Sequence, residues 1–137
     1  MRTEYLGTLK NYKGKMNFII ASGPVIIEKG KVLLDKHGKD EFWKFPGSSI
    51  KKNEGFEECA KKRVKAELGI DIKIIRPLKP MIIWRKNEVI ILIHYLAKRI
   101  GKVKPGKYIR EWKWIDINKL PKDVAPNIKP VLKELKF

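Results

Sequence analysis

The stretch Trp43–Ile70, WKFPGSSIKKNEGFEECAKKRVKAELGI, decides the fold of this chain. It predicts an extended segment that ends at Phe45-Pro46-Gly47, then a loop, and then one amphipathic helix. Within Glu57–Leu68 the apolar side chains recur at four-residue spacing and place one helical face toward a core: Ala60, Val64 and Leu68. Gly69 follows as the left-handed C-cap that ends many helices.

The composition is that of one soluble globular domain. Of the 137 residues, 43% are hydrophobic and 34% are charged, which permits a buried core and does not suit disorder. No apolar run approaches the roughly 18 residues that cross a bilayer, and the N-terminus lacks the apolar core of a signal peptide. The single cysteine, Cys59, excludes an internal disulfide and leaves too few thiols for a zinc cluster. We therefore expect a cytoplasmic protein with no membrane partner, and we expect Cys59 to pack inside the helix.

The formal net charge of +17 is large for this length. It predicts attraction to polyanions, so nucleic acid is one candidate partner. The alternative is compositional: the lysines alternate with acidic and aliphatic residues and glutamine is absent, which is typical of thermophile surfaces. Because the lysines are spread along the chain without a long dense tract, we favour the compositional explanation.

The remaining elements predict one α/β (α+β) domain with a mixed sheet between helices. An N-terminal hairpin is expected over residues 4–22, with Gly23-Pro24 breaking its second strand. A second hairpin turns at Glu28-Lys29-Gly30-Lys31, where glycine permits the backbone that the turn needs. The further expected elements are strands over 72–75, 81–84, a central 88–97 and 111–115, a turn over 116–120, and a terminal helix over about 127–136.

The central stretch resembles the Nudix box, G-x5-E-x7-R-E-U-x-E-E-x-G-U, in which U is a bulky aliphatic residue. The positions that match its expected spacing are Trp43, Pro46, Gly47, Glu54, Glu67, Gly69 and Ile70. The resemblance implies a single domain over 1–137, with an N-terminal hairpin extension over 1–21 and a Nudix-type α/β/α sandwich over 22–137. Its box helix would span about 57–68. In that family, box glutamates and a main-chain carbonyl from the preceding loop hold Mg²⁺ or Mn²⁺ against a diphosphate.

The chain departs from the box where the box carries charge. Four positions differ from the pattern. Ser48 replaces a glycine, Lys62 replaces an arginine, and Arg63 and Ala66 each replace a glutamate. Glu67 is left as the clear metal ligand, together with the backbone carbonyl of Gly47. We expect a Lys62–Glu54 pair to fix the loop, and we expect Arg63 to repel a metal from Glu67 or to pair with it.

The resemblance and its departures together predict a protein that binds a nucleoside-diphosphate-linked or other phosphorylated small molecule. Its Mg-dependent pyrophosphohydrolase activity would be weakened or lost. In this hypothesis the diphosphate contacts cationic side chains directly, namely Arg63, Lys36, Lys44 and Arg85. The alternative for Arg63 is that it bridges only to Glu67 and solvent, and that the pocket is vestigial.

Two further hypotheses stay open. One is an active hydrolase that cleaves a nucleoside diphosphate linked to another group. This enzyme would hold Mg²⁺ or Mn²⁺ with the carbonyl of Gly47 and with carboxylates: Glu67, Glu54, Glu111, and Glu57 or Glu58. The other is a basic nucleic-acid-binding module on the same scaffold. Three tryptophans are candidates for stacking on a base, with at least one expected in the core: Trp84, Trp112 and Trp114. We expect His37 in a loop and His94 in the sheet, with no catalytic or zinc-binding role.

Overall fold

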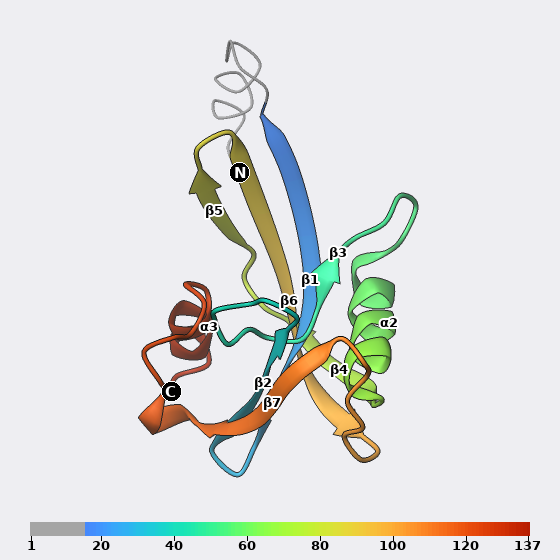
Figure 1. Cartoon of the computed structure of the whole chain (residues 1–137), viewed down its shortest axis with the longest axis vertical. Coiled ribbons are helices and arrows are strands. Elements are labelled where there is room, and N and C mark those ends of the chain that lie inside the picture. Colours follow the sequence, from blue (N-terminus) through green and yellow to red (C-terminus); the bar gives the residue numbers. More distant parts are fainter. Residues whose placement is uncertain (1–15) are drawn as a thin grey trace.

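The computed structural model describes residues 16–137, which form a twisted mixed sheet with a helix on either side (Figure 1). The first strand and the turn of the expected N-terminal hairpin lie outside the described residues. The elements are β1 (Asn17–Glu28), β2 (Lys31–His37), β3 (Ser48–Ser49), α2 (Phe56–Leu68), β4 (Asp71–Pro77), β5 (Met81–Arg85), β6 (Glu88–Ile100), β7 (Ile109–Asp116), the short 3-10 helix η1 (Ile117–Lys119) and α3 (Ile128–Glu134). The predicted α/β (α+β) class is confirmed.

The sheet has the order β4-β6-β1-β2-β7, with β3 paired to β1 and β5 paired to β6. β1 and β6 run parallel from Asn17↔Glu88 to Ile26↔Ala97, and the other pairs are antiparallel. The sheet is therefore mixed, as predicted. The expected central position of β6 is confirmed, because it pairs with three other strands and Val89 is fully buried.

The prediction that Gly23-Pro24 breaks the strand is wrong, because β1 continues through both residues. β3 pairs with β1 up to Ser22, and β2 pairs with it from Ile27. Pro24 lies between these two ladders, where a missing N–H on that edge removes no strand-to-strand hydrogen bond. A Cβ on Gly23 would lie 1.9 Å from the carbonyl oxygen of Pro46, so glycine is needed for that loop to cross the strand.

The two helices cover opposite faces of the sheet (Figure 1). The α2 side of the core includes Ile26, Leu33, Ala60, Val64 and Leu68. The α3 side includes Val25, Leu34, Ile128, Val131 and Leu132. Because consecutive strand residues face opposite sides, β2 sends Leu33 toward α2 and Leu34 toward α3. This alternation positions the polar residues that follow on β2.

The box helix and the terminal helix lie close to their expected ranges. Gly69 adopts the left-handed conformation at φ 69° and donates its N–H to the carbonyl of Lys65, which confirms the predicted C-cap. Asp116 accepts a hydrogen bond from the N–H of Asn118 and begins η1 at the expected turn. Within residues 16–137, no helix is long and apolar enough to cross a membrane.

Candidate functional site

Three titratable side chains meet where the end of β2 packs against the last turn of α2. Asp35 and His37 lie two residues apart on β2 and therefore face the same side of the sheet, toward Glu67. His37 Nε2 is 3.3 Å from Asp35 Oδ1 and 3.3 Å from Glu67 Oε1. Asp35 is fully buried and Glu67 is 9% exposed, whereas the His37 side chain is 34% exposed. A register shift between Lys36 and His37 accompanies this arrangement and helps to aim the imidazole.

The loop between β2 and β3 holds Glu67 in place. The backbone N–H of Gly47 donates to Glu67 Oε2 at 3.1 Å, so the other carboxylate oxygen is left to face His37. Gly47 has φ 140°, and an added Cβ would lie 2.5 Å from the carbonyl oxygen of Ser22. The resemblance to the box predicted that Glu67 and the carbonyl of Gly47 bind one metal ion. In the structure the two residues are joined by a hydrogen bond from the Gly47 N–H to Glu67.

The charges in this cluster favour a protonated His37. The carboxylates of Asp35 and Glu67 raise the pKa of His37 to about 10, because both stabilise the imidazolium form. Burial raises the pKa of Glu67, although the His37 ring and the N–H of Gly47 act in the opposite direction. Since the imidazole is the most exposed of the three groups and faces both acids, His37 carries the proton at neutral pH.

Arg63 and Lys62 do not make the expected pairs. Arg63 Nη2 lies 3.2 Å from Glu54 Oε1, and Lys62 Nζ lies 3.2 Å from Glu58 Oε1. The expected Lys62–Glu54 and Arg63–Glu67 pairs are therefore wrong. One residue turns the helix by about 100°, which points Arg63 at the loop and Lys62 at solvent. Arg63 thus performs the loop-fixing role predicted for Lys62, and the N–H of Lys51 also donates to Glu54.

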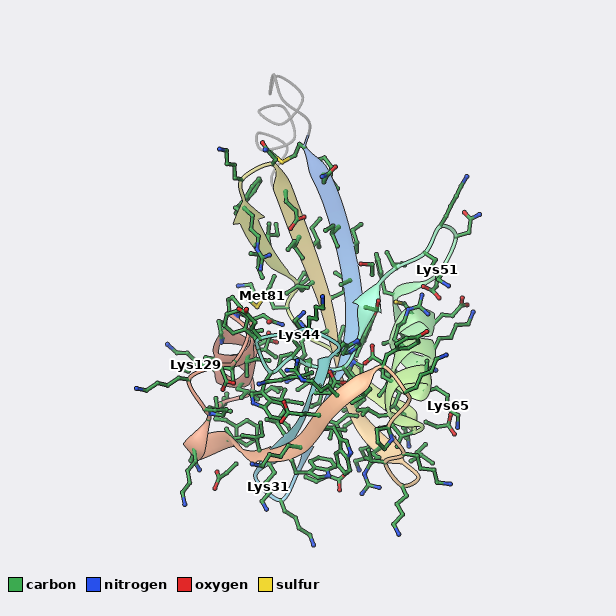
Figure 2. All side chains as sticks on the ribbon, viewed as in Figure 1. Lys31, Lys44, Lys51, Lys65, Met81 and Lys129 are labelled. Atoms are coloured by element: carbon green, nitrogen blue, oxygen red, sulfur yellow. The ribbon has the colours of Figure 1, made fainter. Side chains whose placement is uncertain are left out.

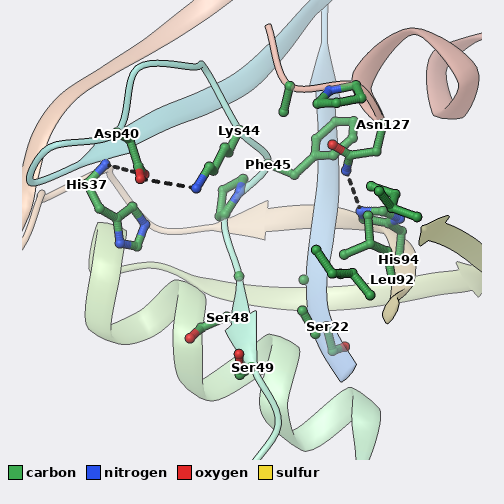
Figure 3. Close-up of a pocket in the computed structure, with 18 of the residues that line it drawn as sticks. Ser22, His37, Asp40, Lys44, Phe45, Ser48, Ser49, Leu92, His94 and Asn127 are labelled. Atoms are coloured by element: carbon green, nitrogen blue, oxygen red, sulfur yellow. Dashed lines mark hydrogen bonds and ion pairs between the residues drawn. The ribbon is translucent and has the colours of Figure 1, made fainter. Parts of the chain in front are cut away.

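A cavity of about 390 Å³ opens beside this cluster (Figure 3). One part of its wall is formed by Phe45, His94 and Asn127, and another part by His37, Asp40 and Lys44. Ile83, Arg85 and Leu92 complete the side toward β5 and β6. The cavity thus combines an apolar, ring-bearing region with cationic side chains.

His94 and Asn127 form a buried polar pair in the cavity wall. Burial lowers the pKa of His94 to about 4, so its ring is neutral at physiological pH. In that form His94 Nε2 accepts a hydrogen bond from Asn127 Nδ2 at 3.2 Å. The ring also packs edge-to-face on Phe45, with centroids 5.1 Å apart. The predicted sheet position of His94 is confirmed, since it lies in β6.

The structure separates the residues predicted to bind phosphate. Lys44 and Arg85 line the cavity. Lys36 lies on the face of β2 opposite to Asp35 and His37. There its Nζ is 3.0 Å from Asp123 Oδ2 and 4.8 Å from the ring centroid of Trp43. Lys36 and Arg63 are not among the residues that line the cavity, so the four predicted cations do not converge.

The remaining candidates fall on several surfaces. Glu111 on β7 lies opposite Lys36 on β2, and its Oε2 is 3.9 Å from Lys36 Nζ. It therefore shares the face of Lys36 and points away from Glu67. Trp84 and Trp112 are exposed, whereas Trp114 packs in the α2 side of the core, as expected for at least one tryptophan. The other candidate acids on α2, Glu57 and Glu58, are exposed at its first turn. Cys59 is fully buried, which confirms its packing role.

Sequence reasoning missed Asp35, His37 and Asn127. His37 was expected in a loop, which is wrong, because it is the last residue of β2. Its spacing from Asp35 was the available signal, since residues two apart on a strand share a face. Asn127 carried no signal, because only the fold places it beside His94.

The NUDIX domain model matches residues 17–135. The chain belongs to the Nudix family. Among similar proteins, an "8-oxo-dGTP diphosphatase" of Buchnera aphidicola subsp. Schizaphis graminum (strain Sg) is 26% identical over 109 residues, covering 75% of this chain and 82% of that protein. YtkD of Bacillus subtilis (strain 168), provisionally named as the same kind of enzyme, is 30% identical over 100 residues. That match covers 73% of this chain and 63% of YtkD.

Solved structures of Nudix proteins share this fold at low sequence identity. A MutT Nudix hydrolase from Burkholderia pseudomallei has a TM-score of 0.79 at 20% identity, covering 87% of this chain and 98% of that one. A MutT protein from Methanosarcina mazei Go1 has a TM-score of 0.79 at 18% identity, covering 90% and 96% of the two chains.

Nudix enzymes generally use a divalent metal, so the box of this chain can be tested against that requirement. Mg²⁺ prefers several hard oxygen ligands in octahedral geometry. Here one box glutamate is replaced by Arg63, whose guanidinium is paired with Glu54, and another by Ala66. Glu67 is the one glutamate that remains of the three in the R-E-U-x-E-E part of the box, and its free oxygen faces a nitrogen of His37. The box residues therefore do not fit the family's magnesium site.

Proposed function

We propose that this Nudix protein binds a nucleotide-like ligand with a diphosphate in the cavity beside Gly47, and that its Mg-dependent hydrolysis is weak or lost. One observation carries the proposal: a cavity of about 390 Å³ with apolar and cationic walls lies next to a box that lacks two of its acids. A diphosphate can bind through cationic side chains without a metal.

The cavity offers different chemistry for the two parts of such a ligand. Phe45, Ile83 and Leu92 supply apolar surface for a planar ring. Asn127 is held by His94 through Nδ2, so its carbonyl oxygen and second N–H are available to a polar ring edge. Lys44 and Arg85 supply positive charge for phosphate oxygens. Lys44 now pairs with Asp40 at 3.1 Å, an exposed contact that a phosphate can replace.

Calorimetric titration with ADP and GDP in the presence of EDTA tests this proposal, because it measures binding without metal. We expect measurable binding by the parent and affinity at least about tenfold weaker in Lys44→Ala/Arg85→Ala, which loses two charge-assisted contacts. The matched control is Lys65→Ala/Lys129→Ala, which removes the same net charge from exposed helix positions away from the cavity. No binding by the parent, or equal loss in both double variants, would contradict the proposal.

A working diphosphatase is the second candidate function. The names of the two relatives, both of which refer to 8-oxo-dGTP diphosphatase, favour it. It requires a metal to be held with fewer box acids than the family pattern provides. Turnover measurements separate it from the leading proposal.

The nucleic-acid hypothesis stays a prediction from the net charge of +17. The lysines labelled in Figure 2 do not gather on one face: Lys31, Lys51, Lys65 and Lys129 project from separate edges of the molecule. This spread favours the compositional explanation of the charge.

A further inference from the structure

We propose that Asp35, His37 and Glu67 form a binding site for a first-row transition-metal dication, for which Zn²⁺ is the best match. The site shares Glu67 with the Nudix box but takes its other two ligands from β2, which lies outside the box. The proposal does not depend on nucleotide binding.

The distances fit metal ligands better than hydrogen-bond partners. His37 Nε2 lies 3.3 Å from a carboxylate oxygen of each acid. A hydrogen bond between an imidazolium and a carboxylate is shorter, about 2.7–2.9 Å, and one Nε2–H can point straight at only one of two acceptors. Ligand atoms around tetrahedral Zn²⁺, with bonds of about 2.0–2.2 Å, lie roughly 3.3–3.5 Å apart. The nitrogen therefore stands at a tetrahedral ligand spacing from both oxygens.

The burial of Asp35 is the second observation. Asp35 is 0% exposed, and neither of its carboxylate oxygens makes a hydrogen bond with suitable geometry. Its close ionic partner is the His37 ring, to which Oδ1 is directed at 3.3 Å. A buried carboxylate without hydrogen bonds is costly, and most such groups have a partner. A dication between the three side chains would replace the Nε2 proton of His37, which is released to solvent, and would bind both carboxylates.

The surroundings prepare the site for a metal. Gly47 N–H holds Oε2 of Glu67, the kind of outer hydrogen bond that orients ligating carboxylates. The three ligand atoms lie within 4.8 Å of one another, so small side-chain rotations bring both oxygens onto one ion. His37 borders the cavity, which leaves a fourth coordination position open to water or to a ligand oxygen.

The donor set selects the class of metal. One imidazole nitrogen with two carboxylates suits Zn²⁺ and neighbouring transition metals. Mg²⁺ is less suited, because it prefers oxygen ligands only and retains several waters. The site therefore differs in chemistry from the magnesium site of the family.

Titration of metal-stripped full-length protein with Co²⁺ tests the proposal, because the visible spectrum of Co²⁺ reports its ligands and geometry. We expect one equivalent to bind with the intense visible bands of a four-coordinate ion, and we expect Zn²⁺ to displace it. Both His37→Gln and Asp35→Asn should lose the bands. The matched controls are Glu58→Gln, an exposed acid on the same helix, and His94→Gln, which changes the second of the two histidines.

Zn²⁺-dependent thermal unfolding supplies a second readout. Zn²⁺ should raise the Tm of the parent and leave that of His37→Gln unchanged, since only the native state presents the site. His37 is partly exposed, so its variant should fold, and circular dichroism checks this. Absence of stoichiometric Co²⁺ binding by the parent, or binding that survives in His37→Gln, would overturn the proposal. No nucleotide is present, so either result leaves the proposed ligand binding unaffected.

Discussion

At the scale of single residues, the two histidines show how surroundings set a pKa. Two carboxylates raise the pKa of His37 to about 10, whereas burial lowers that of His94 to about 4. At neutral pH the first is a cation beside the box and the second is a neutral acceptor in the cavity wall. The same side chain therefore has opposite chemical roles about one cavity.

The low pKa of His94 predicts that the protein loses stability in mild acid. Its pKa is about 4 when folded and about 6.5 when unfolded, so the unfolded state takes up the proton first. The stabilising effect of the neutral ring is complete above pH 6.5 and is lost as the pH falls toward 4. Urea unfolding should show that His94 contributes a decrease of about 2 kcal/mol in the free energy of unfolding between pH 7 and pH 5.

The variant His94→Gln isolates this contribution from other groups. Burial raises the pKa of Glu67, so this carboxyl also affects the pH dependence, but it is present in both proteins. The variant should lose less stability than the parent between pH 7 and pH 5. Equal slopes in the two proteins would show that His94 is not the responsible group.

At the scale of elements, the close crossing of β1 and the loop before β3 fixes the site. Gly23 and Gly47 face one another without side chains, and the crossing places the Gly47 N–H on Glu67. α2 is also joined to the loop after β3, through Arg63 and Glu54. The two loops and the helix therefore act as one unit, although the charges of the box have changed.

Gly23→Ala should disturb this unit. The new Cβ would lie 1.9 Å from the Pro46 carbonyl oxygen, so the backbone has to move. We expect a loss of about 1–3 kcal/mol in the free energy of unfolding, measured with urea, and loss of the Gly47–Glu67 hydrogen bond. The control Gly55→Ala, whose Cβ meets no heavy atom closer than 3.9 Å, should cost much less. Equal costs would contradict a close crossing of Gly23 and the Pro46 carbonyl.

The elements were largely predictable from the sequence, and their exceptions have local causes. The apolar spacing and Gly69 predicted α2 to within one residue, because helix period and C-cap are local signals. The prediction that Pro24 breaks its strand was wrong, because a proline disrupts a strand only where a neighbouring strand needs its missing N–H. Neither β3 nor β2 pairs with β1 at that point.

At the scale of the whole molecule, the site depends on contacts that sequence alone does not contain. Asp35 and Glu67 come from different elements and meet at His37, and His37 lines one cavity together with His94 and Asn127. The resemblance to the box predicted Glu67 and its proximity to Gly47, but not the partner of Arg63 or the contribution of β2. Such pairings follow from topology and helix rotation, which a linear pattern specifies incompletely.

We propose that this Nudix fold lacks the box acids needed for efficient Mg-dependent hydrolysis. The most direct test is turnover with Mg²⁺ as the sole metal, on a panel of nucleoside diphosphate derivatives and 8-oxo-dGTP. Arg63→Glu/Ala66→Glu is measured beside the parent. We expect the parent to be near background and the double variant to be faster. Parent turnover at ordinary enzyme rates, about 1–10³ s⁻¹, that is abolished by Glu67→Gln would contradict this proposal.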